Sequence, residues 1–448
     1  MAEGCDAFPH RSRSEGVDPP DQLLRFWVVI GNNPANSTSE WSAGPDQPDP
    51  DRVGPSLKRL LADRARALIA ETCGHLSEAK QIRTCGVNPT KGLSDVAVEH
   101  HPNGYAYTTG LQTCKSVWAC PICSFKIRTK RAIEIAVAIA VHRAKGGSVM
   151  LLTLTTQHSF GESLDEVWDQ VQETWSWLIK HYRYTQLRKR LGLAFIRTIE
   201  VMHGLNGWHP HLHVLLFSDV EIDPFDTRDQ YHEIARIFHD LWIDHMKTEY
   251  GRDVRSSYGV DLRMVKADDA KGVGTYCTKA GYEVAMADGK EGRARTSRHP
   301  FAIAYDAVET GDTQSIALFR EWIKGSHGRH MWSWSKGLRE AVGLGPEKTD
   351  EELADEADET VGRICTISKK LWRQIITTRI GLRARFLAAL DNGRAGLDQA
   401  IGLLLDHGLG VQVETRSPGD PPRLRALGEP RERPAPTTTQ PTEGRTCV

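Results

Sequence analysis

The sequence predicts an α+β fold in which helices flank a central antiparallel sheet. Strand-like and helix-like segments follow one another in the order strand, helix, hairpin, helix, strand and helix, at 149–156, 163–190, 195–217, 224–250, 259–266 and 267–286. Two strand-like runs in the middle are separated by Asn206-Gly207, a dipeptide typical of tight β-hairpin turns. Because a hairpin makes its two strands antiparallel, we expect an antiparallel centre.

Local signals set the ends of these elements. A helix is expected over 124–145, and Gly146-Gly147 ends it before an apolar strand begins. Ser163 and Glu166 have the spacing of a capping box for a long helix that ends near residue 190. Proline at position 224 opens the next helix in the same way.

Composition shifts divide the 448 residues into five parts. The expected order is a disordered tail, a helix with a Cys-rich segment, the α+β domain that carries the candidate site described below, an acidic linker with a helical extension, and a second disordered tail, at 1–55, 56–123, 124–340, 341–410 and 411–448. The C-terminal extension is expected to hold helices at about 361–390 and 395–407.

The hairpin carries the first candidate site. With Asn206-Gly207 as a type I′ turn, Glu200 pairs with His213 and Met202 with His211. Side chains alternate across a strand, so Glu200, His211 and His213 share one face while the other face is apolar. Two imidazoles and a carboxylate leave open positions on a divalent ion. His209 is either a neighbour that positions this site or the start of the strand, and two strand histidines without a metal are the simpler alternative.

The cysteines suggest a second metal. Cys114, Cys120 and Cys123 lie within ten residues, and nine cysteines in all fit ligation better than a disulfide framework. We expect a structural Zn²⁺ held by these three and Cys85, with Cys73 and His75 as the competing source of a ligand. Reduced core thiols are the alternative.

Basic and aromatic residues suggest nucleic acid, although 57 Lys and Arg balance 58 Asp and Glu. The expected DNA contacts are Lys126, Arg128, Lys130 and Arg131 on the helix after the cysteines and Arg329, Trp332 and Lys336 in the stretch HGRHMWSWSKGLR. Solvation of a helix face is the alternative for the helix charges, and at least one of Trp332 and Trp334 is expected to pack in the core.

Tyr276 supplies a candidate nucleophile. On the expected helix, Lys279 and Glu283 lie on the same face as Tyr276. A phenol with an ordinary pKa near 10 needs a nearby cation and a polarised phosphate to act as a nucleophile. Tyr282 points away from this face because of its helical offset, so one nucleophile is expected.

Three ordered motifs, LLTLTT at 151–156, HPHLHVLLF with Glu200, and Tyr276-Cys277-Thr278-Lys279, resemble those of HUH endonucleases. They are most similar to the rolling-circle replication initiators of small bacterial plasmids, and the cysteine cluster and the segment HMWSWSKGLR are similar to the actinobacterial branch. The resemblance covers about residues 82–340 and implies an HUH-like fold.

The resemblance implies that Tyr276 attacks one strand at the double-strand origin and leaves a 5′-phosphotyrosine and a free 3′-hydroxyl. It also implies Mg²⁺ or Mn²⁺ at His211, His213 and Glu200. Thr153 and Thr155 would be structural neighbours of the site. Related initiators place a glutamate four residues before the tyrosine to activate water at termination, whereas this chain has Gly272 there, so Asp269 and Glu283 are the candidates for that role.

Other functions fit parts of the pattern. An HUH-type transposase or relaxase uses related chemistry, although relaxases place the tyrosine before the histidines. A zinc-dependent DNA-binding regulator would need no catalysis. The expected partners are origin DNA, as a single strand or cruciform, and a host helicase and polymerase. Because no apolar run of membrane-spanning length is present, no membrane partner is expected and the cytoplasm is the expected location.

Overall fold

The structure is a computed structural model of the whole chain. It describes residues 66–429 except 68, 72, 103, 224–229, 256–258, 266–296, 357 and 379–380. The chain forms two compact units, a first unit of Met1–Arg83 with Cys114–Glu356 and a second unit of Thr84–Thr113 with Ala357–Val448. None of the described helices combines the length and apolarity needed to cross a bilayer.

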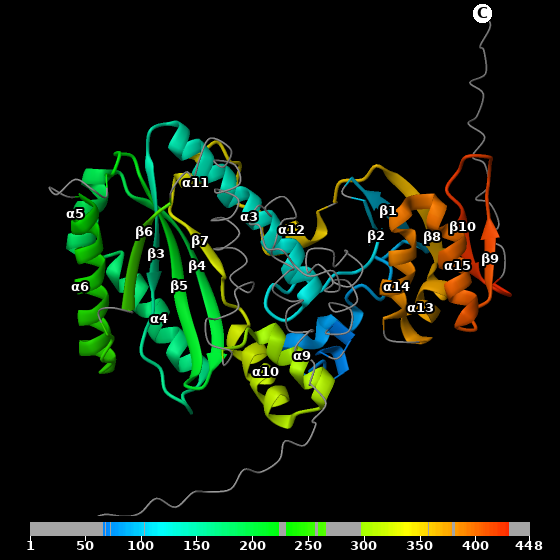
Figure 1. Cartoon of the computed structure of the whole chain (residues 1–448), viewed down its shortest axis with the longest axis horizontal. Coiled ribbons are helices and arrows are strands. Elements are labelled where there is room, and N and C mark those ends of the chain that lie inside the picture. The colour runs from blue at the N-terminus through cyan, green and yellow to red at the C-terminus, as the bar shows by residue number, and fades with distance from the viewer. Residues whose placement is uncertain are drawn as a thin grey trace, which may run out of the picture. The chain divides into compact units, whose positions relative to one another are not determined.

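The first unit is built on a five-stranded sheet with the order β6-β3-β5-β4-β7 (Figure 1). The strands are β3 (Ser148–Leu154), β4 (Ala194–Gly204), β5 (Gly207–Ser218), β6 (Val260–Met264) and β7 (Trp332–Trp334). Every neighbouring pair in this sheet is antiparallel, which confirms the α+β expectation with an antiparallel centre.

Helices cover both faces of this sheet. On one face, Trp175 of α4 (Leu164–Leu178) packs edge-on against Phe195 of β4 with 5.1 Å between ring centroids. The indole of Trp242 in α6 (Gln230–Tyr250) donates to the Thr155 carbonyl on that side of the molecule. On the other face, His142 of α3 (Pro121–Ala144) meets the ring of Phe217 at 5.2 Å. The fold is therefore layered, with α3 opposite α4 and α6 (Figure 1).

The first unit also contains several shorter helical elements. Helices α9 (Pro300–Thr310) and α10 (Thr313–Ser326) follow one another, and α11 (Leu338–Ala341) and α12 (Asp350–Asp355) are short. A 3-10 helix at Ser77–Thr84 precedes the second unit's first strand.

The second unit is a sheet with the order β2-β1-β8-β10-β9. Its strands are β1 (Asp95–His101), β2 (Tyr105–Thr109), β8 (Gly362–Ser368), β9 (Val411–Glu414) and β10 (Arg423–Ala426). Only the β8–β10 pair is parallel among them. An apolar core joins it to α13 (Lys369–Thr378), α14 (Leu382–Ala389), a 3-10 turn (Leu390–Gly396) and α15 (Leu397–Asp406).

The helix expected over 163–190 is two helices. The Ser163 hydroxyl caps α4 as expected, accepting from Glu166 N, but α4 ends at Leu178 and α5 spans Tyr182–Leu191. His181 causes the break, because its backbone is extended and its ring accepts a hydrogen bond from Arg183 N at 3.3 Å.

Two C-terminal expectations were wrong. The stretch 362–368, expected to begin a helix, is strand β8, because it pairs with β1 on one side and with β10 on the other. Strands β9 and β10 form inside 411–448, the part expected to be a tail without regular structure. Both strands need partners that are distant in sequence, which local pattern does not reveal.

Candidate active site

The β4–β5 hairpin brings three predicted metal ligands together. Glu200 Oε2 lies 2.8 Å from His211 Nε2 and 2.7 Å from His213 Nε2. Each residue offers one ligand atom, and the three atoms lie within 4.8 Å of one another. The predicted placement on one sheet face is therefore confirmed.

The register differs from the expected one by two residues. Glu200 pairs with His211 rather than His213, and the two residues at the turn are Leu205 and Asn206. A type I′ turn needs a positive φ at both of its central residues. Gly207 has a φ of 85°, but Lys115 is the only described non-glycine residue with a positive φ, so Asn206 does not have one. The expected type I′ turn is therefore wrong. A shift of two keeps the same side chains on the same face, which is why the site survives the error.

The site is largely shielded from water. The side chains of Glu200 and His213 are 5% and 8% exposed, and that of His211 is 12% exposed. Burial by itself would raise the pKa of Glu200, but the charge of His211 and hydrogen bonds from both imidazoles hold that pKa well below its usual range. The carboxylate is therefore ionised at neutral pH, as a metal ligand must be.

Further side chains surround the ligands. Thr153 Oγ1 of β3 lies 3.3 Å from His213 Nδ1, so the expectation that Thr153 borders the site is confirmed. The ring of His209 stacks on that of His158 with 4.4 Å between centroids, and the His209 carbonyl lies 3.3 Å from His211 Nδ1. Burial, reinforced by the charges of His211 and His158, lowers the pKa of His209 to about 3, so this ring is neutral.

His158 is a site neighbour that the sequence did not single out. It follows β3 by four residues and has no spacing that relates it to the hairpin histidines. A histidine on the loop after LLTLTT was the signal available, but pairing it with His209 needs the sheet order.

The predicted nucleophile lies outside the described residues, as do Lys279, Asp269, Gly272 and Glu283. Both flanks of that segment are attached to the site's sheet. Val265 N donates to the Val149 carbonyl at 2.9 Å, and Arg298 exchanges two backbone hydrogen bonds with His203, three residues from Glu200. The chain therefore leaves and rejoins the same sheet on either side of Tyr276.

The predicted cysteine ligands also lie together. The sulfur atoms of Cys85, Cys114, Cys120 and Cys123 lie within 4.8 Å of one another, and all four residues are buried. Four thiolates about 2.3 Å from a zinc ion have sulfurs about 3.8 Å apart, and the Cys114 and Cys123 sulfurs are 3.7 Å apart. The donor set therefore fits a tetrahedral zinc ion. Among the described residues, the cysteine cluster does not include Cys73.

Comparison with known proteins identifies the family. A model of the Rep_1 family, described as replication protein, matches residues 107–361, which is more than half of the chain. The chain belongs to this family of replication proteins. The matched region contains the Glu200–His211–His213 site and three of the four clustered cysteines, but not Cys85.

Relatives of this replication protein come from Streptomyces. It is 24% identical over 369 residues to the protein named Protein rep of Streptomyces lividans, covering 67% of this chain and 80% of the relative. A protein named neomycin resistance protein in Streptomyces cyanogenus is 30% identical over 139 residues, covering 25% of this chain and 32% of that relative. No solved structure matches. The family match and the Streptomyces lividans relative support a plasmid replication initiator of the actinobacterial type.

Several residues predicted to contact DNA instead form ion pairs and hydrogen bonds within this replication protein. Arg128 and Arg131 of α3 are 2% and 3% exposed. Arg128 Nε donates to Ser124 Oγ at 2.9 Å, and Arg131 pairs with Glu134, Glu347 and Asp350. Lys130 Nζ lies 2.8 Å from a Glu356 carboxylate oxygen. Within the described part of the chain, these cations already have acceptors.

The aromatic-basic stretch is also largely structural. Trp332 is 6% exposed on β7, which confirms that at least one of the two tryptophans packs in the core, and the Arg131 guanidinium lies 5.8 Å from its ring centroid. Arg329 lies over Trp168 and pairs with Asp165 and Asp169. Of the seven predicted DNA contacts, Lys336 is exposed, and Lys126, Lys130 and Arg329 are partly exposed.

Proposed function

We propose that this replication protein starts rolling-circle plasmid replication by nicking one DNA strand at the double-strand origin, with Tyr276 as the nucleophile. The observation that carries the proposal is the convergence of His211 and His213 on one oxygen of Glu200, at 2.8 and 2.7 Å. Two imidazoles and one carboxylate on a single sheet face leave room for a phosphate oxygen beside a divalent ion.

The bond changes balance without a further reactant. The Tyr276 hydroxyl oxygen attacks the scissile phosphorus, loses its proton and forms a P–O bond to the 5′ side. The bond from phosphorus to the 3′ oxygen breaks, and that oxygen takes up a proton to become the 3′-hydroxyl that primes synthesis. Because one phosphodiester replaces another, the phosphotyrosine retains the bond energy, and the reverse attack rejoins the strand.

The side chains of the hairpin would bind Mg²⁺ or Mn²⁺. When bound there, the ion supplies charge stabilisation for a phosphoryl oxygen during in-line displacement. Glu200 contributes an ionised carboxylate because its pKa is held low. Thr153 faces the Nδ1 atom of His213 and would keep Nε2 of that ring turned toward the ion.

The length of the chain after Val265 limits how far Tyr276 can lie from the sheet. Tyr276 follows Val265 by eleven residues, and an extended chain covers about 3.3–3.6 Å per residue. Since Val265 is bonded to β3 of the same sheet, the phenol is tethered within about 40 Å of its own sheet. In this proposal Lys279 stabilises the phenolate or the phosphate, and Asp269 or Glu283 activates water when replication ends.

The deciding experiment incubates purified protein with a supercoiled origin plasmid and Mn²⁺. Wild type is expected to convert the plasmid to the nicked form and to remain covalently attached to the 5′ end. Tyr276→Phe is expected to do neither, and Tyr282→Phe, the matched control, is expected to nick like wild type. EDTA is expected to stop nicking.

Three results would contradict parts of the proposal. Nicking by Tyr276→Phe at the wild-type rate would remove the nucleophile assignment. Nicking that EDTA leaves unchanged would remove the metal assignment. Loss of nicking in Tyr282→Phe but not in Tyr276→Phe would move the nucleophile to the second tyrosine.

The remaining parts of the proposal concern zinc and partners. The Cys85, Cys114, Cys120 and Cys123 cluster would hold a structural Zn²⁺. We assign to DNA two cations of the first unit, Lys126, which is partly exposed, and Lys336, which is exposed. The origin DNA is bound as a single strand or cruciform, and a host helicase and polymerase, encountered in the cytoplasm, would extend the 3′-hydroxyl.

A further inference from the structure

Helix α13 of the second unit carries positive charge that pairs with no carboxylate among the described residues. Lys369, Lys370 and Arg373 are exposed on it, and Arg385 is exposed on the next helix, α14. The sequences of these helices, KKLWRQIITT and LRARFLAA, contain no acidic residue. Among the described residues, these four cations have no side-chain hydrogen bond or ion pair, whereas Arg363, Arg423 and Arg425 of the same unit each pair with a carboxylate.

The position of two of these charges makes the contrast sharper. Lys369 and Lys370 occupy the first turn of α13, where the helix dipole disfavours cations. Helix α5 of the first unit is also basic, but Arg188 and Lys189 lie in its last turn, where the dipole favours them. Arg190 of α5 in addition pairs with Glu233. The interaction with the helix dipole therefore stabilises α5 with its last-turn cations and destabilises α13 with its first-turn cations.

We infer that the exposed side of α13, with Arg385 of α14, is a surface that binds the phosphates of double-stranded DNA. Lys369, Lys370 and Arg373 lie within about one helical turn, so their charges reach adjacent phosphates. The phosphates of bound DNA would neutralise these positive charges. This inference rests on the proposed function for its biological setting, because the duplex would be the plasmid origin.

The burial of the aromatic residues indicates that this surface binds duplex rather than single-stranded DNA. Surfaces for unpaired bases offer aromatic rings for stacking. The aromatic residues of α13 and α14 are Trp372 and Phe386, and both are 0% exposed in the core of the unit. A surface with cations and no exposed ring fits the backbone of a duplex.

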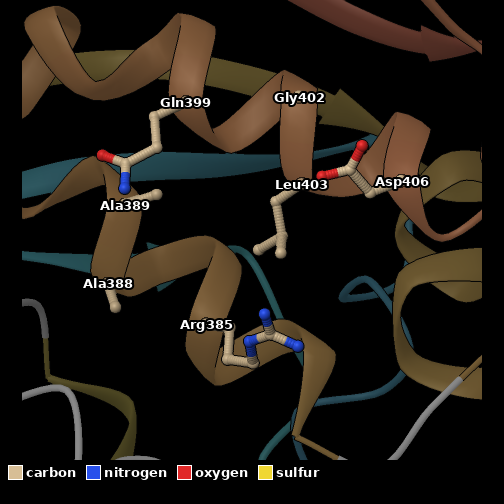
Figure 2. A pocket seen from close by; sticks show the side chains of 7 residues that line it. All are labelled: Arg385, Ala388, Ala389, Gln399, Gly402, Leu403 and Asp406. Atoms are coloured by element: carbon tan, nitrogen blue, oxygen red, sulfur yellow. The ribbon is translucent and has the colours of Figure 1, made fainter.

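A neighbouring groove shares Arg385 with this surface. It lies between α14 and α15 and has a volume of about 510 Å³. Its lining combines small or apolar residues with Gln399 and with Arg385 and Asp406, which lie on opposite helices (Figure 2). Because Asp406 would repel phosphate, DNA is expected on the α13 side of Arg385 rather than inside the groove.

The test measures how the affinity of the full-length chain for a 30-base-pair duplex depends on salt, in a Tyr276→Phe background without added divalent metal. Each phosphate contact contributes about 0.9 to the slope of log K against log salt. The variant Lys369→Gln/Lys370→Gln/Arg373→Gln is expected to flatten this slope by about 2 to 3. The matched control Lys180→Gln/Arg188→Gln/Lys189→Gln removes three exposed charges of the first unit and is expected to change it by less than about 1.

The outcomes separate this inference from the proposed function. Equal slopes for wild type and the α13 variant, or equal flattening by the control, would overturn it. The α13 variant with Tyr276 intact is expected to nick a single-stranded origin oligonucleotide at the wild-type rate. If wild type does not nick at all, the proposed function fails, while the slopes still test the surface. Thermal unfolding checks that the α13 variant is folded, and removal of first-turn cations is expected to leave its stability equal or higher.

Discussion

Glu200 Oε2 lies 2.7 Å from Nε2 of His213, although the two residues are not partners in the strand register. His213 is opposite Thr198, and Glu200 is opposite His211. The carboxylate therefore reaches diagonally across the hairpin to a second imidazole, a distance that neighbouring strands allow for long side chains. This diagonal contact turns two strand positions into a three-ligand site.

Replacing Glu200 with Gln is expected to weaken Mn²⁺ binding by more than the roughly 10–100-fold that loss of an outer-shell partner costs. The amide has the shape of the carboxylate but lacks its charge. Isothermal titration with Mn²⁺ measures the change. Glu221→Gln, which alters an exposed carboxylate in the same unit, is expected to bind like wild type, and equal losses in both variants would count against the metal site.

Thr153→Val is expected to reduce Mn²⁺ affinity by about tenfold, less than loss of Glu200. Valine keeps the volume of threonine but cannot bond to His213 Nδ1, 3.3 Å from the hydroxyl. Thr153→Ser keeps a hydroxyl there and is expected to restore most of the affinity. If Ser and Val behave alike, packing rather than the hydrogen bond orients His213.

Loss of Cys120 is expected to remove zinc. Protein purified without chelator should contain about one zinc per chain, measured by elemental analysis, and Cys120→Ser should contain none and unfold at a lower temperature. Cys365→Ala is the control, because burial, with a smaller effect from Glu99, raises the pKa of that thiol to about 12 and keeps it protonated. Zinc that is retained in Cys120→Ser would contradict the assignment.

Trp332→Ala is expected to lower the free energy of unfolding by about 3–5 kcal/mol. The side chain is 6% exposed and packs beneath the Arg131 guanidinium, so truncation leaves a cavity. Lys336→Ala, four residues away and exposed, is expected to change stability by less than about 0.5 kcal/mol. Urea denaturation of both variants makes the comparison, and a small effect of Trp332→Ala would instead favour a role in binding bases.

The Glu356 carboxylate is expected to stabilise the fold in a pH-dependent way. Hydrogen bonds from Lys130 and Lys348, opposed only weakly by burial, lower the pKa of Glu356 to about 2. Because the folded pKa is below the ordinary 4.5, the contribution is full above about pH 4.5 and is lost as the pH falls toward 2. Glu356 is more than one-third exposed, so the contribution is about 0.2–1 kcal/mol.

That contribution is measured as the stability difference between wild type and Glu356→Gln. The difference is expected to be constant from pH 7 to 5 and to shrink from pH 4 to 3. A difference that grows on acidification would show that the carboxylate is not held by the two lysines.

The sequence by itself determined the parts of the site that depend on alternation. A period of two puts Glu200, His211 and His213 on one face under either register, so the site was predicted even though the turn was misplaced by two residues. The Ser163 cap and the antiparallel centre were predicted for the same reason, because each depends on residues that are close in the chain.

Only the tertiary structure decided which charges are available and which distant segments pair. Arg128 and Arg131 follow the cysteines in a basic run. In the folded protein Arg128 donates to Ser124, and Arg131 forms ion pairs with Glu134, Glu347 and Asp350. Strand β8 joins β1, more than 250 residues earlier, and so groups 84–113 with the C-terminal residues. Residue spacing reveals neither the burial of these arginines nor the pairing of β8 with β1, because both depend on contacts between segments that are distant in sequence.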